Sequence, residues 1–401
     1  MTPSGIPLPL SDIRVVDLSR VLAGPYCTMM LGDLGAEVIK IELPGRGDDT
    51  RQWGPPYAGS ESAYYLCTNR NKMGMTLNLK TDEGKAILRE LVRKSDVLVE
   101  NFRAGSMDRW ELGYQALKQL NPGLVYCSIT GYGSDGPYRD RPGYDFVIQA
   151  EGGIMSITGP ADGAPHKVGV AIVDITTGMF AATAILAALR ERERSGQGQQ
   201  IDMSLLECQV AWLANVASNY LVSGDQPGRY GNDHPNIVPY GVFETADGHV
   251  ALGVGNDRQF RAFCQAAGCQ HLGDDPRFAT NPDRVGNRDL LIPYLQVVFR
   301  ERTTGEWLAL IHEIDIPGGP INTIDQVFEH PQLKSRGITT EVPHENAGTV
   351  KLVRSPMNLL RTPPEIRRPP PLLGEHTDKI LKGLLGYRTD EVDGLRQTGV
   401  L

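Results

Sequence analysis

Short apolar runs rich in β-branched residues alternate with segments of helical periodicity in the N-terminal third of the chain. The candidate strands are residues 13–17, 37–42, 75–79, 96–100 and 123–129. Between them, residues 26–35 and 81–94 have the apolar spacing of helices, and Thr81 is a suitable N-terminal cap for the second. Strands that alternate with helices predict a parallel sheet, whose ligands bind beyond the carboxyl ends of the strands.

The stretch V-G-V-A-I-V-D-I-T-T-G-M-F at residues 168–180 places one charge between two apolar segments. Residues 168–173 predict a buried strand, and a buried helix follows Asp174. An Asp just before a helix is commonly a cap whose carboxylate accepts N–H bonds from the first turn. The helix dipole also keeps such a carboxylate ionised, so it can act as a nucleophile towards an activated acyl group. The residues alone are compatible with both roles.

The composition changes after a long helix expected to end near Val222. The next residues are rich in Gly, Asp, Asn and Pro, and a proline-rich stretch at 361–371 predicts an extended crossing segment. A final helix is expected at 377–385. A chain of 401 residues favours two domains. The expected division is a large domain over 1–222, a linker at 223–239, a small α/β domain over 240–320, and a return to the large domain over 321–401.

Charge and composition argue against several classes of partner. The net charge of -8 provides no general basic field for nucleic acid or acidic membranes. Six scattered cysteines and eight histidines show no metal-ligand spacing, so we expect reduced thiols, no metal and a cytoplasmic location. No signal peptide opens the chain, and the apolar stretch at 179–189 is too short to span a bilayer. We therefore expect neither nucleic-acid nor membrane partners.

Three weaker candidates lie at predicted strand ends. The glycine turn that begins at Gly253 is either an ordinary turn or a flap whose N–H groups meet an oxyanion. The segment 100–110 sets two arginines beside aromatic residues, which is either surface decoration or a site for phosphates and a purine. Lys40, Lys72 and Lys80 together predict a local positive rim.

Eight short motifs then carry a family resemblance over nearly the whole chain. They are L-S-R-V-L-A-G-P at 18–25, L-G-A-E-V-I-K-I-E at 34–42, N-R-N-K at 69–72, E-N-F-R at 100–103, G-Y-G-S-D-G-P at 131–137, G-Y-D-F at 143–146, V-G-V-A-I-V-D-I-T-T-G at 168–178 and L-G-E-H-T at 373–377. In this order the chain resembles the class III CoA-transferases, a family that includes the α-methylacyl-CoA racemases. Residues 236–250 look most like its succinyl-CoA:dicarboxylate branch, which acts on hydroxymethylglutarate or glutarate.

The resemblance implies an α/β architecture and an assembly. In this family a Rossmann-like large domain with a parallel sheet is built from both chain ends, and two linkers carry a smaller α/β domain. Ring-shaped subunits of this kind interlock as a homodimer. The substrates are CoA thioesters and carboxylic acids, and no cofactor is permanently bound.

The resemblance also assigns roles to residues. Asp174 matches the catalytic aspartate, which forms an acyl anhydride and then an aspartyl-CoA thioester; Asp145 lies beside it. Gly253 and Gly255 match a glycine loop that shields these intermediates. The CoA contacts implied are Val21, Ala23, Leu77, Lys80, Asn101, Phe102, Arg103, Arg109 and Tyr144. Leu22 and Leu43 depart from relatives that carry a catalytic glutamine and a phosphate-binding arginine there.

Several functions remain to be weighed against one another. We expect succinyl-CoA as donor and a dicarboxylate as acceptor, with Arg258 or Arg20 binding the free carboxylate. The racemase branch needs two bases and has a histidine where this chain has Tyr144, a poor base near neutral pH. A dehydrogenase would need the missing G-x-G-x-x-G motif. A noncatalytic CoA-binding protein would not need Asp174.

Overall fold

The computed structural model describes residues 6–401, which form two compact units that share the chain. Unit 1 holds the described part of Met1–Gly153 together with Val168–Ser218 and Arg336–Leu401, and unit 2 holds Ile154–Lys167 and Asn219–Ser335. The sequence assigns residues 154–167 to the large domain, whereas the structure assigns them to unit 2. The reason is a contact distant in sequence: Arg229 donates to the carbonyl oxygens of Pro160 and Gly163.

Unit 1 is built on a six-stranded sheet in the order β5-β2-β1-β6-β7-β8, and every adjacent pair is parallel. Its strands are β1 Arg14–Asp17, β2 Glu37–Glu42, β5 Lys72–Thr76, β6 Val97–Glu100, β7 Val125–Thr130 and β8 Gln200–Ser204. The parallel sheet is confirmed. Sequence analysis placed β5 three residues too late and missed β8, because Gln200 and Asp202 interrupt its apolar pattern.

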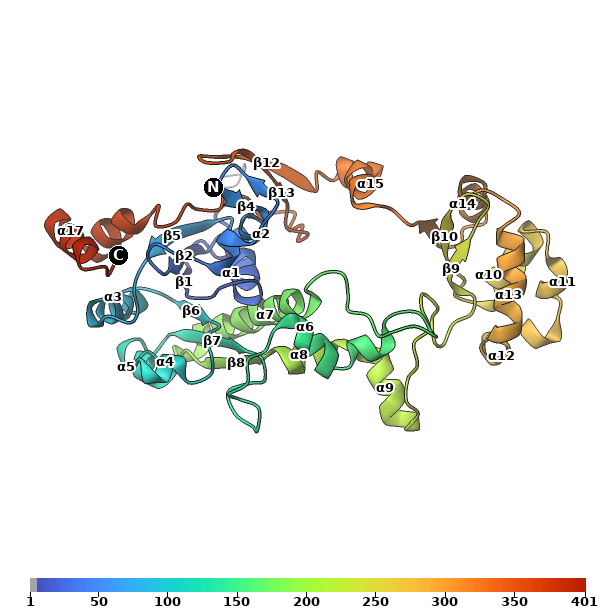
Figure 1. Cartoon of the computed structure of the whole chain (residues 1–401), viewed down its shortest axis with the longest axis horizontal. Helices are drawn as coiled ribbons and strands as arrows, with labels where there is room; N and C mark the ends of the chain where they lie inside the picture. The colour runs from blue at the N-terminus through green and yellow to red at the C-terminus, as the bar shows by residue number, and fades with distance from the viewer. Residues whose placement is uncertain (1–5) are drawn as a thin grey trace. The chain divides into compact units, whose positions relative to one another are not determined.

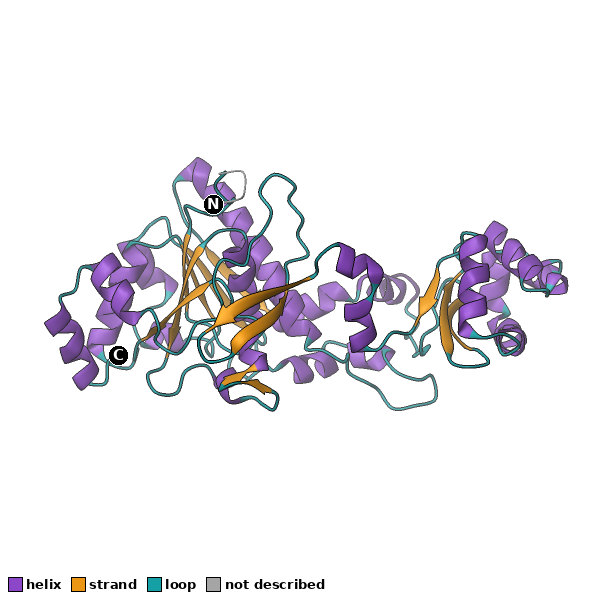
Figure 2. Cartoon of the chain, turned by 90° about the horizontal axis from the view of Figure 1, so that it is seen from above, coloured by secondary structure: helices purple, strands orange, loops and turns teal. Residues whose placement is uncertain are grey.

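Helices cover both faces of this sheet (Figure 2). In β1, Val15 packs into one core with α1 and α7, and Val16 packs into the other with α3, α5 and the C-terminal helices. The helices of unit 1 are α1 Ala23–Asp33, α2 Ala63–Leu66, α3 Asp82–Arg93, α4 Ser106–Arg109, α5 Tyr114–Leu120, α6 Asp145–Glu151, α7 Ile172–Ser195, α8 Leu205–Trp212, the 3-10 helix η1 Asp49–Gln52, the π-helix η4 Lys379–Leu385 and α17 Thr389–Gln397. Two hairpins, β3 Tyr57–Ala58 with β4 Glu61–Ser62 and β12 Thr339–His344 with β13 Gly348–Val353, complete it.

The helix α7 differs from its prediction at both ends. The expected strand over residues 168–173 is a loop that enters the helix at Ile172, and Val170 is exposed. The helix has 24 residues, so by length and composition alone it is long enough to cross a membrane, contrary to the sequence-based estimate. Its buried residues pack in the core against α1. The two helices touch at Gly178, where an added Cβ would lie 2.6 Å from the carbonyl oxygen of Ala23.

Two other helix predictions also change. The single helix expected to end near Val222 is divided into α8 and α9 (Ala214–Ser223), because Ala214 adopts a left-handed conformation with φ of 45°. The expected C-terminal helix is the π-helix η4, and α17 follows it. The proline-rich segment has no regular structure, as expected. Its Arg367 lies along α1 and donates to the carbonyl oxygens of Gly32 and Ala36.

Unit 2 is a smaller α/β body with an antiparallel sheet in the order β11-β10-β9. Stacked aromatic side chains form its core, with ring centroids of Phe243 and Phe299 4.4 Å apart and Trp307 against Phe299. Its elements are η2 Ile154–Ile157, β9 Tyr240–Glu244, β10 His249–Gly253, α10 Asp257–Ala266, α11 Gln270–Gly273, η3 Pro276–Phe278, α12 Asn281–Gly286, α13 Arg288–Phe299, α14 Thr304–Glu313, β11 Gly318–Pro320, α15 Ile324–Glu329 and α16 Pro331–Ser335. Figure 1 labels the elements along the chain.

Candidate active site

A cavity of about 320 Å³, here called the Asp174 cavity, lies beyond the carboxyl ends of β1, β6 and β7. Its walls come from the loops that follow these strands and from the first turn of α7. The lining includes Arg20, Val21, Leu22, Ala23, Asn101, Phe102, Arg103, Gly131, Arg139, Arg141, Tyr144 and Asp174. The position agrees with the expectation for a ligand of a parallel sheet.

Asp174 lies within the first turn of α7 and does not cap it. The helix begins at Ile172, and its N-terminal N–H groups are bound by Asp145 from α6: the Oδ1 atom accepts from the backbone N–H of Val173 at 2.7 Å and of Asp174 at 3.2 Å. The cap interpretation of Asp174 is therefore wrong. In the described part of the chain the Asp174 carboxylate accepts no hydrogen bond and forms no ion pair. It is a partly exposed group that faces the cavity with its oxygens free.

The surroundings of Asp174 make its carboxylate hard to ionise. Burial raises the pKa of Asp174 to about 7, and the neighbouring Asp145 charge adds to the effect. This corrects the sequence-based expectation that the helix N-terminus alone would keep the group fully ionised, because the first-turn N–H groups bind Asp145 instead. A carboxylate with a pKa near 7 is more basic, and hence more nucleophilic, than an ordinary aspartate, and a large fraction is ionised at neutral pH.

A second cavity of about 290 Å³, here called the Lys80 cavity, adjoins the first, since Arg20 and Phe102 line both. Of the expected CoA contacts, Leu77 and Lys80 line this cavity, while Val21, Ala23, Asn101, Arg103 and Tyr144 line the Asp174 cavity. Phe102 packs edge-to-face against Trp110 at 5.2 Å where the two cavities meet. The structure thus brings eight of the nine expected contacts to one continuous depression.

Three expected site residues line neither the Asp174 cavity nor the Lys80 cavity. Arg109 is exposed, lines neither cavity and donates to the Ser106 hydroxyl at 2.8 Å. Gly253 and Gly255 belong to unit 2. There the N–H of Gly253 donates to the carbonyl of Pro317, and that of Gly255 to the side chain of Gln259. Since both N–H groups are occupied, the structure gives no support to their interpretation as oxyanion donors.

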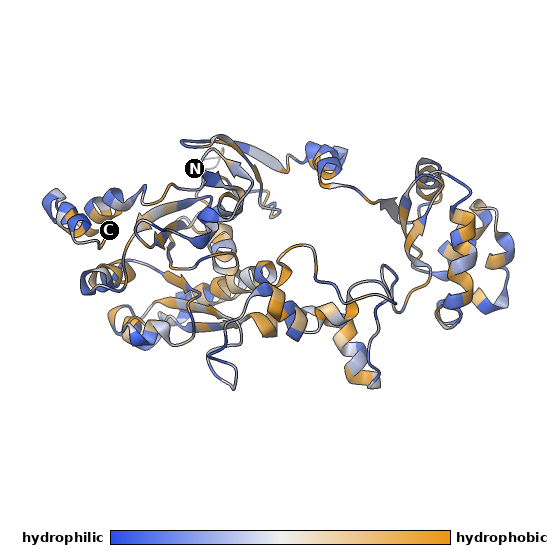
Figure 3. Ribbon diagram, viewed as in Figure 1, coloured by the Kyte–Doolittle hydropathy of each residue, from blue (hydrophilic) through white to orange (hydrophobic). Residues whose placement is uncertain are grey.

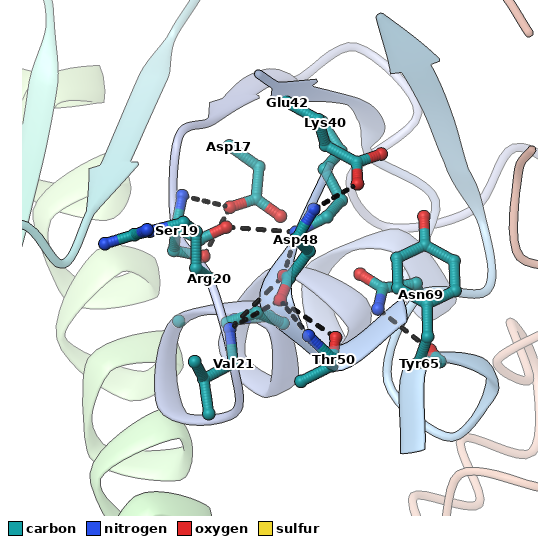
Figure 4. Close-up of polar contacts among 12 residues, drawn as sticks. Asp17, Ser19, Arg20, Val21, Lys40, Glu42, Asp48, Thr50, Tyr65 and Asn69 are labelled. Carbon is teal, nitrogen blue, oxygen red and sulfur yellow. Dashed lines mark hydrogen bonds and ion pairs between the residues drawn. The ribbon is translucent and has the colours of Figure 1, made fainter. Parts of the chain in front are cut away.

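Two of the lysines in the expected positive rim are instead fully buried in ion pairs. The Lys72 Nζ donates to Asp17 at 3.0 Å. The Lys40 Nζ donates to Asp48 at 2.9 Å and to the carbonyl of Ser19 (Figure 4). Burial alone would raise the pKa of Asp17, but the two lysine charges lower it below its usual value. Lys40 and Lys72 therefore stabilise the strand ends, and only Lys80 of the three lines a cavity.

This buried network also fixes the loop that follows β1. Val21 has a φ of 68°, which is unusual for a β-branched residue and strained. Both carboxylate oxygens of Asp48 accept the Val21 N–H at 3.2 Å, and Asp48 also accepts from Thr50 (Figure 4). The side-chain amide of Asn101 binds both the N–H and the carbonyl of Arg20 at 2.8 Å. The loop is thus held rigidly beside Asp174.

Sequence reasoning missed three site features. Burial raises the pKa of Tyr64 to about 12 and the Asp174 charge adds to the effect, so this phenol interacts electrostatically with the Asp174 carboxylate. Arg139 and Arg141 line the Asp174 cavity, and Arg141 stacks on Tyr138 at 3.6 Å. The loop that carries them is closed at its base by Gly131 and Gly143, where a Cβ on either would collide with the other's backbone. The cluster of charges at 139–141 was the available signal.

Leu22 and Leu43, the two departures from the family pattern, have different surroundings. Leu22 is buried and lines the Asp174 cavity, so an apolar group stands where some relatives have an amide. Leu43 is exposed in the Lys80 cavity beside Arg46. Among residues 6–401, no group of three or more His, Cys, Asp or Glu side chains is arranged to hold a metal ion.

Comparisons with known proteins identify the family of the chain. Residues 10–377 match the family model described as CoA-transferase family III. The chain is 44% identical to succinyl-CoA:glutarate CoA-transferase of Mus musculus over 98% of this chain and 90% of the relative. It is 47% identical to succinate–glutarate CoA-transferase of Agrobacterium fabrum, covering 94% and 96%. The crystal structure of a CaiB/BaiF family protein from Brucella suis matches with a TM-score of 0.84 and 44% identity, covering 94% and 100%.

Proposed function

Because the chain belongs to CoA-transferase family III, we propose that it moves CoA from succinyl-CoA to a dicarboxylic acid, with Asp174 as the covalent nucleophile. Its CoA-transferase activity follows from the family and from relatives with that activity at 44% and 47% identity. Two of those relatives are named for succinate or succinyl-CoA together with glutarate, which supports succinyl-CoA as donor and a dicarboxylate as acceptor.

The observation that carries the proposal is the isolated carboxylate of Asp174. A structural aspartate is normally hydrogen-bonded or paired, whereas this one faces a cavity without a partner among the described residues. Burial and Asp145 make it more basic than an ordinary aspartate. Such a group is suited to attack a thioester.

The exchange needs no external energy source, because each step replaces one activated acyl bond by another. An Asp174 oxygen attacks the donor carbonyl, the C–S bond breaks, and CoA thiolate leaves behind a mixed anhydride. The thiolate attacks the Asp174 acyl carbon, releasing succinate and leaving an aspartyl thioester. The acceptor carboxylate attacks that carbon, expelling thiolate and forming a second anhydride. Thiolate attack on the acceptor's acyl carbon then frees Asp174 and gives the new CoA thioester.

The two adjoining cavities support an extended CoA. The thioester lies in the Asp174 cavity, and the nucleotide end lies in the Lys80 cavity, whose charged wall residues include Lys80 and Arg46. Arg46 supplies a guanidinium three residues after Leu43, where some relatives have their arginine. Positive groups in a partly apolar site bind phosphates well.

Free carboxylates of the substrates need a cation in the Asp174 cavity. Arg20 lines this cavity and has only a long, exposed ion pair with Asp49 at 3.5 Å, so its charge is available. Arg141 forms no ion pair in the described structure and is held by its stack on Tyr138. Both are candidates for the distal carboxylate. Arg258, which the sequence also suggests for the free carboxylate, belongs to unit 2. We keep it as a third candidate for this role.

The test is to trap the intermediate. The protein is incubated with succinyl-CoA, treated with borohydride and digested, and the peptide containing Asp174 is analysed by mass spectrometry. A reduced adduct is expected in the wild type and in Glu207→Ala, which alters an exposed acid in the first turn of α8, but not in Asp174→Ala. If no acyl-CoA gives an adduct, covalent transfer is wrong, and solvent deuterium exchange at the acyl α-carbon would then identify a racemase.

We also propose a homodimer with interlocked subunits. Helices α7 and α8 carry large apolar side chains exposed on unit 1: Met179, Phe180, Val210 and Trp212 are between 37% and 50% exposed. Figure 3 shows hydrophobic residues continuing along α8 and α9. An apolar surface of this kind is typical of a subunit interface. Light scattering tests the dimer: a monomeric mass at micromolar concentration would contradict it.

The state of the cysteines supports the expected cytoplasmic location. All six cysteines are free thiols in the structure, and five of them are buried. Unpaired thiols are typical of a reducing compartment.

A further inference from the structure

Gln149 is a fully buried residue of α6 that links the acidic pair to the loop before α7. Its Nε2 donates to Asp145 Oδ2 at 2.6 Å, and its Oε1 accepts the backbone N–H of Val168 at 2.9 Å. Asp145 precedes it by four residues on the same helix, so the two side chains share one face. Both ends of the amide are therefore used.

Asp145 and Gln149 together hold the segment 168–174 at two points. Asp145 Oδ1 binds the N–H groups of Val173 and Asp174, at the start of α7. Gln149 binds Val168 at the other end of the loop, next to the boundary with unit 2. The orientation of the Asp145 carboxylate thus depends on an amide that is itself oriented by the loop.

We propose that Gln149 is a positioning residue for CoA transfer, which fixes Asp145 and thereby the loop and helix end that present the Asp174 nucleophile. The inference rests on the proposed function. Gln149 does not line the Asp174 cavity, so its effect is transmitted through Asp145.

The chemistry explains why an amide suits this position. Asp174 attacks as a carboxylate while Asp145 accepts three N–H bonds, so two negative charges lie close together in the reactive state. Gln149 supplies an N–H donor without adding a charge. Tyr64 from α2 interacts electrostatically with both carboxylates, and Arg20, Arg103, Arg139 and Arg141 line the cavity that Asp174 also lines. Loss of the Gln149 donor should therefore leave the Asp145 carboxylate less firmly oriented towards the N–H groups at the start of α7.

Two variants separate positioning from simple packing. Gln149→Met keeps the length of the side chain but removes both hydrogen bonds. Gln149→Glu keeps the shape, and its carboxyl group can donate to Asp145 only while it is protonated. The matched control is Gln209→Met in α8, since Gln209 is equally buried but its amide atoms have no partner among the described residues.

The pH profile of kcat/KM with succinyl-CoA is the readout. In Gln149→Met kcat/KM is expected to fall about tenfold across the whole profile, because the hydrogen bond that orients Asp145 is lost whether or not Asp174 is protonated. Gln149→Glu should restore activity at low pH and lose it in a new alkaline limb, as the added carboxyl group ionises. Gln209→Met should keep the wild-type profile even if it lowers stability.

The outcomes separate this inference from the proposed function. If the wild type is active and both Gln149 variants keep its kcat/KM and its pH profile, the positioning role is wrong and the transferase proposal still stands. A wild type that forms no Asp174 adduct would overturn both. Urea unfolding of each variant between pH 5 and 8 follows the same ionisation without turnover, so a variant with low activity still reports on the pair.

Discussion

Two groups of buried or partly buried aspartates lie close together in unit 1, and they differ in whether a cation accompanies them. Asp17 and Asp48 are paired with Lys72 and Lys40, and these pairs are closed off from solvent. Asp145 and Asp174 have no ion-pair partner in the described structure, and Asp145 instead uses N–H groups. The lysines lower the pKa of Asp17, whereas burial and a like charge raise that of Asp174.

The difference is consistent with a structural role for Asp17 and Asp48 and with the reactive role proposed for Asp174. A paired, hydrogen-bonded carboxylate is stable and unreactive, and the Asp17–Lys72 pair fixes the end of β1 and the loop after it. An unpaired carboxylate beside another acid costs stability but retains its basicity for chemistry. The sequence around each contains a strand or helix boundary, so only the three-dimensional partners distinguish them.

The largest effect is expected from Asp174→Asn, which removes the nucleophile with little change in shape. Transfer of CoA should fall at least about a thousandfold, while the folded protein becomes more stable at pH 8 by roughly 2 kcal/mol. CoA release and urea denaturation measure the two quantities. If Asp174→Asn transferred CoA as fast as the wild type, Asp174 would not be the nucleophile, and its lack of an ion pair would have no catalytic meaning.

Lys72→Met should show the opposite behaviour, a large loss of stability with the chemistry preserved. Removing one partner of a buried ion pair leaves Asp17 uncompensated and costs about 3–5 kcal/mol. Urea unfolding at pH 7 measures this cost, and kcat per folded molecule should stay within about threefold. The double variant with Asp17→Asn should recover part of the stability, and its failure to do so would show that Lys72 acts through other contacts.

The pH dependence of stability should have opposite slopes for the two groups. Asp174 has a raised pKa, so the native state binds more protons than the unfolded state between about pH 4 and 7, and stability falls as pH rises there. Asp17 and Asp48 have lowered pKa values, so their stabilisation is present above about pH 4 and is lost on further acidification. Urea midpoints from pH 3 to 8 should peak near pH 4–5 in the wild type. Asp174→Asn should reduce the slope above pH 5, and Glu100, whose pKa burial also raises to about 7, should account for part of the slope that stays.

The smallest effect is expected at Val21, which is hydrogen-bonded to Asp48 and also lines the Asp174 cavity. Val21→Gly relieves a strained φ and should raise stability by about 1 kcal/mol or less. The freed loop should bind succinyl-CoA more weakly, so KM rises a few-fold with kcat unchanged. Steady-state kinetics and urea unfolding measure these changes, with Val353→Gly at the exposed end of β13 as control. A fall in kcat alone would mean that the loop acts on the chemical step.

Much of the fold of unit 1 follows from local patterns. β-Branched runs placed β1, β2 and β6 within a residue of their observed bounds, and Thr81 caps α3 as expected. β8 was missed because its side chains alternate between polar and apolar at one edge of the sheet. The break at Ala214 and the membership of residues 154–167 depend on tertiary contacts, which local periodicity does not encode.

The sequence singled out Asp174 as a lone charge between two apolar segments, and the structure places it in the lining of a cavity, while its catalytic role stays a prediction. The pKa of Asp174 could not be predicted from the sequence, because the N–H groups of the first turn bind Asp145, 29 positions earlier in the sequence. Lys40 and Lys72 have the same local signal as Lys80, a lysine at or near a strand end, yet only Lys80 lines a cavity. Lys40 and Lys72 differ from Lys80 because they are buried, and their burial depends on which strands are neighbours in the sheet.

Residues 380–400 complete one core of unit 1, and this has a consequence for folding during synthesis. Ile380, Leu381, Val392 and Val400 pack in the same core as Val16 of β1, and the N–H of Asn78 donates to the carbonyl of Val400 at 2.8 Å. A ribosome makes β1 long before these residues, so one face of the nascent sheet stays uncovered until they have been made. A transcript that stops short of this tail would yield a chain with its nucleophile present and its core open, a natural target for chaperones and proteases.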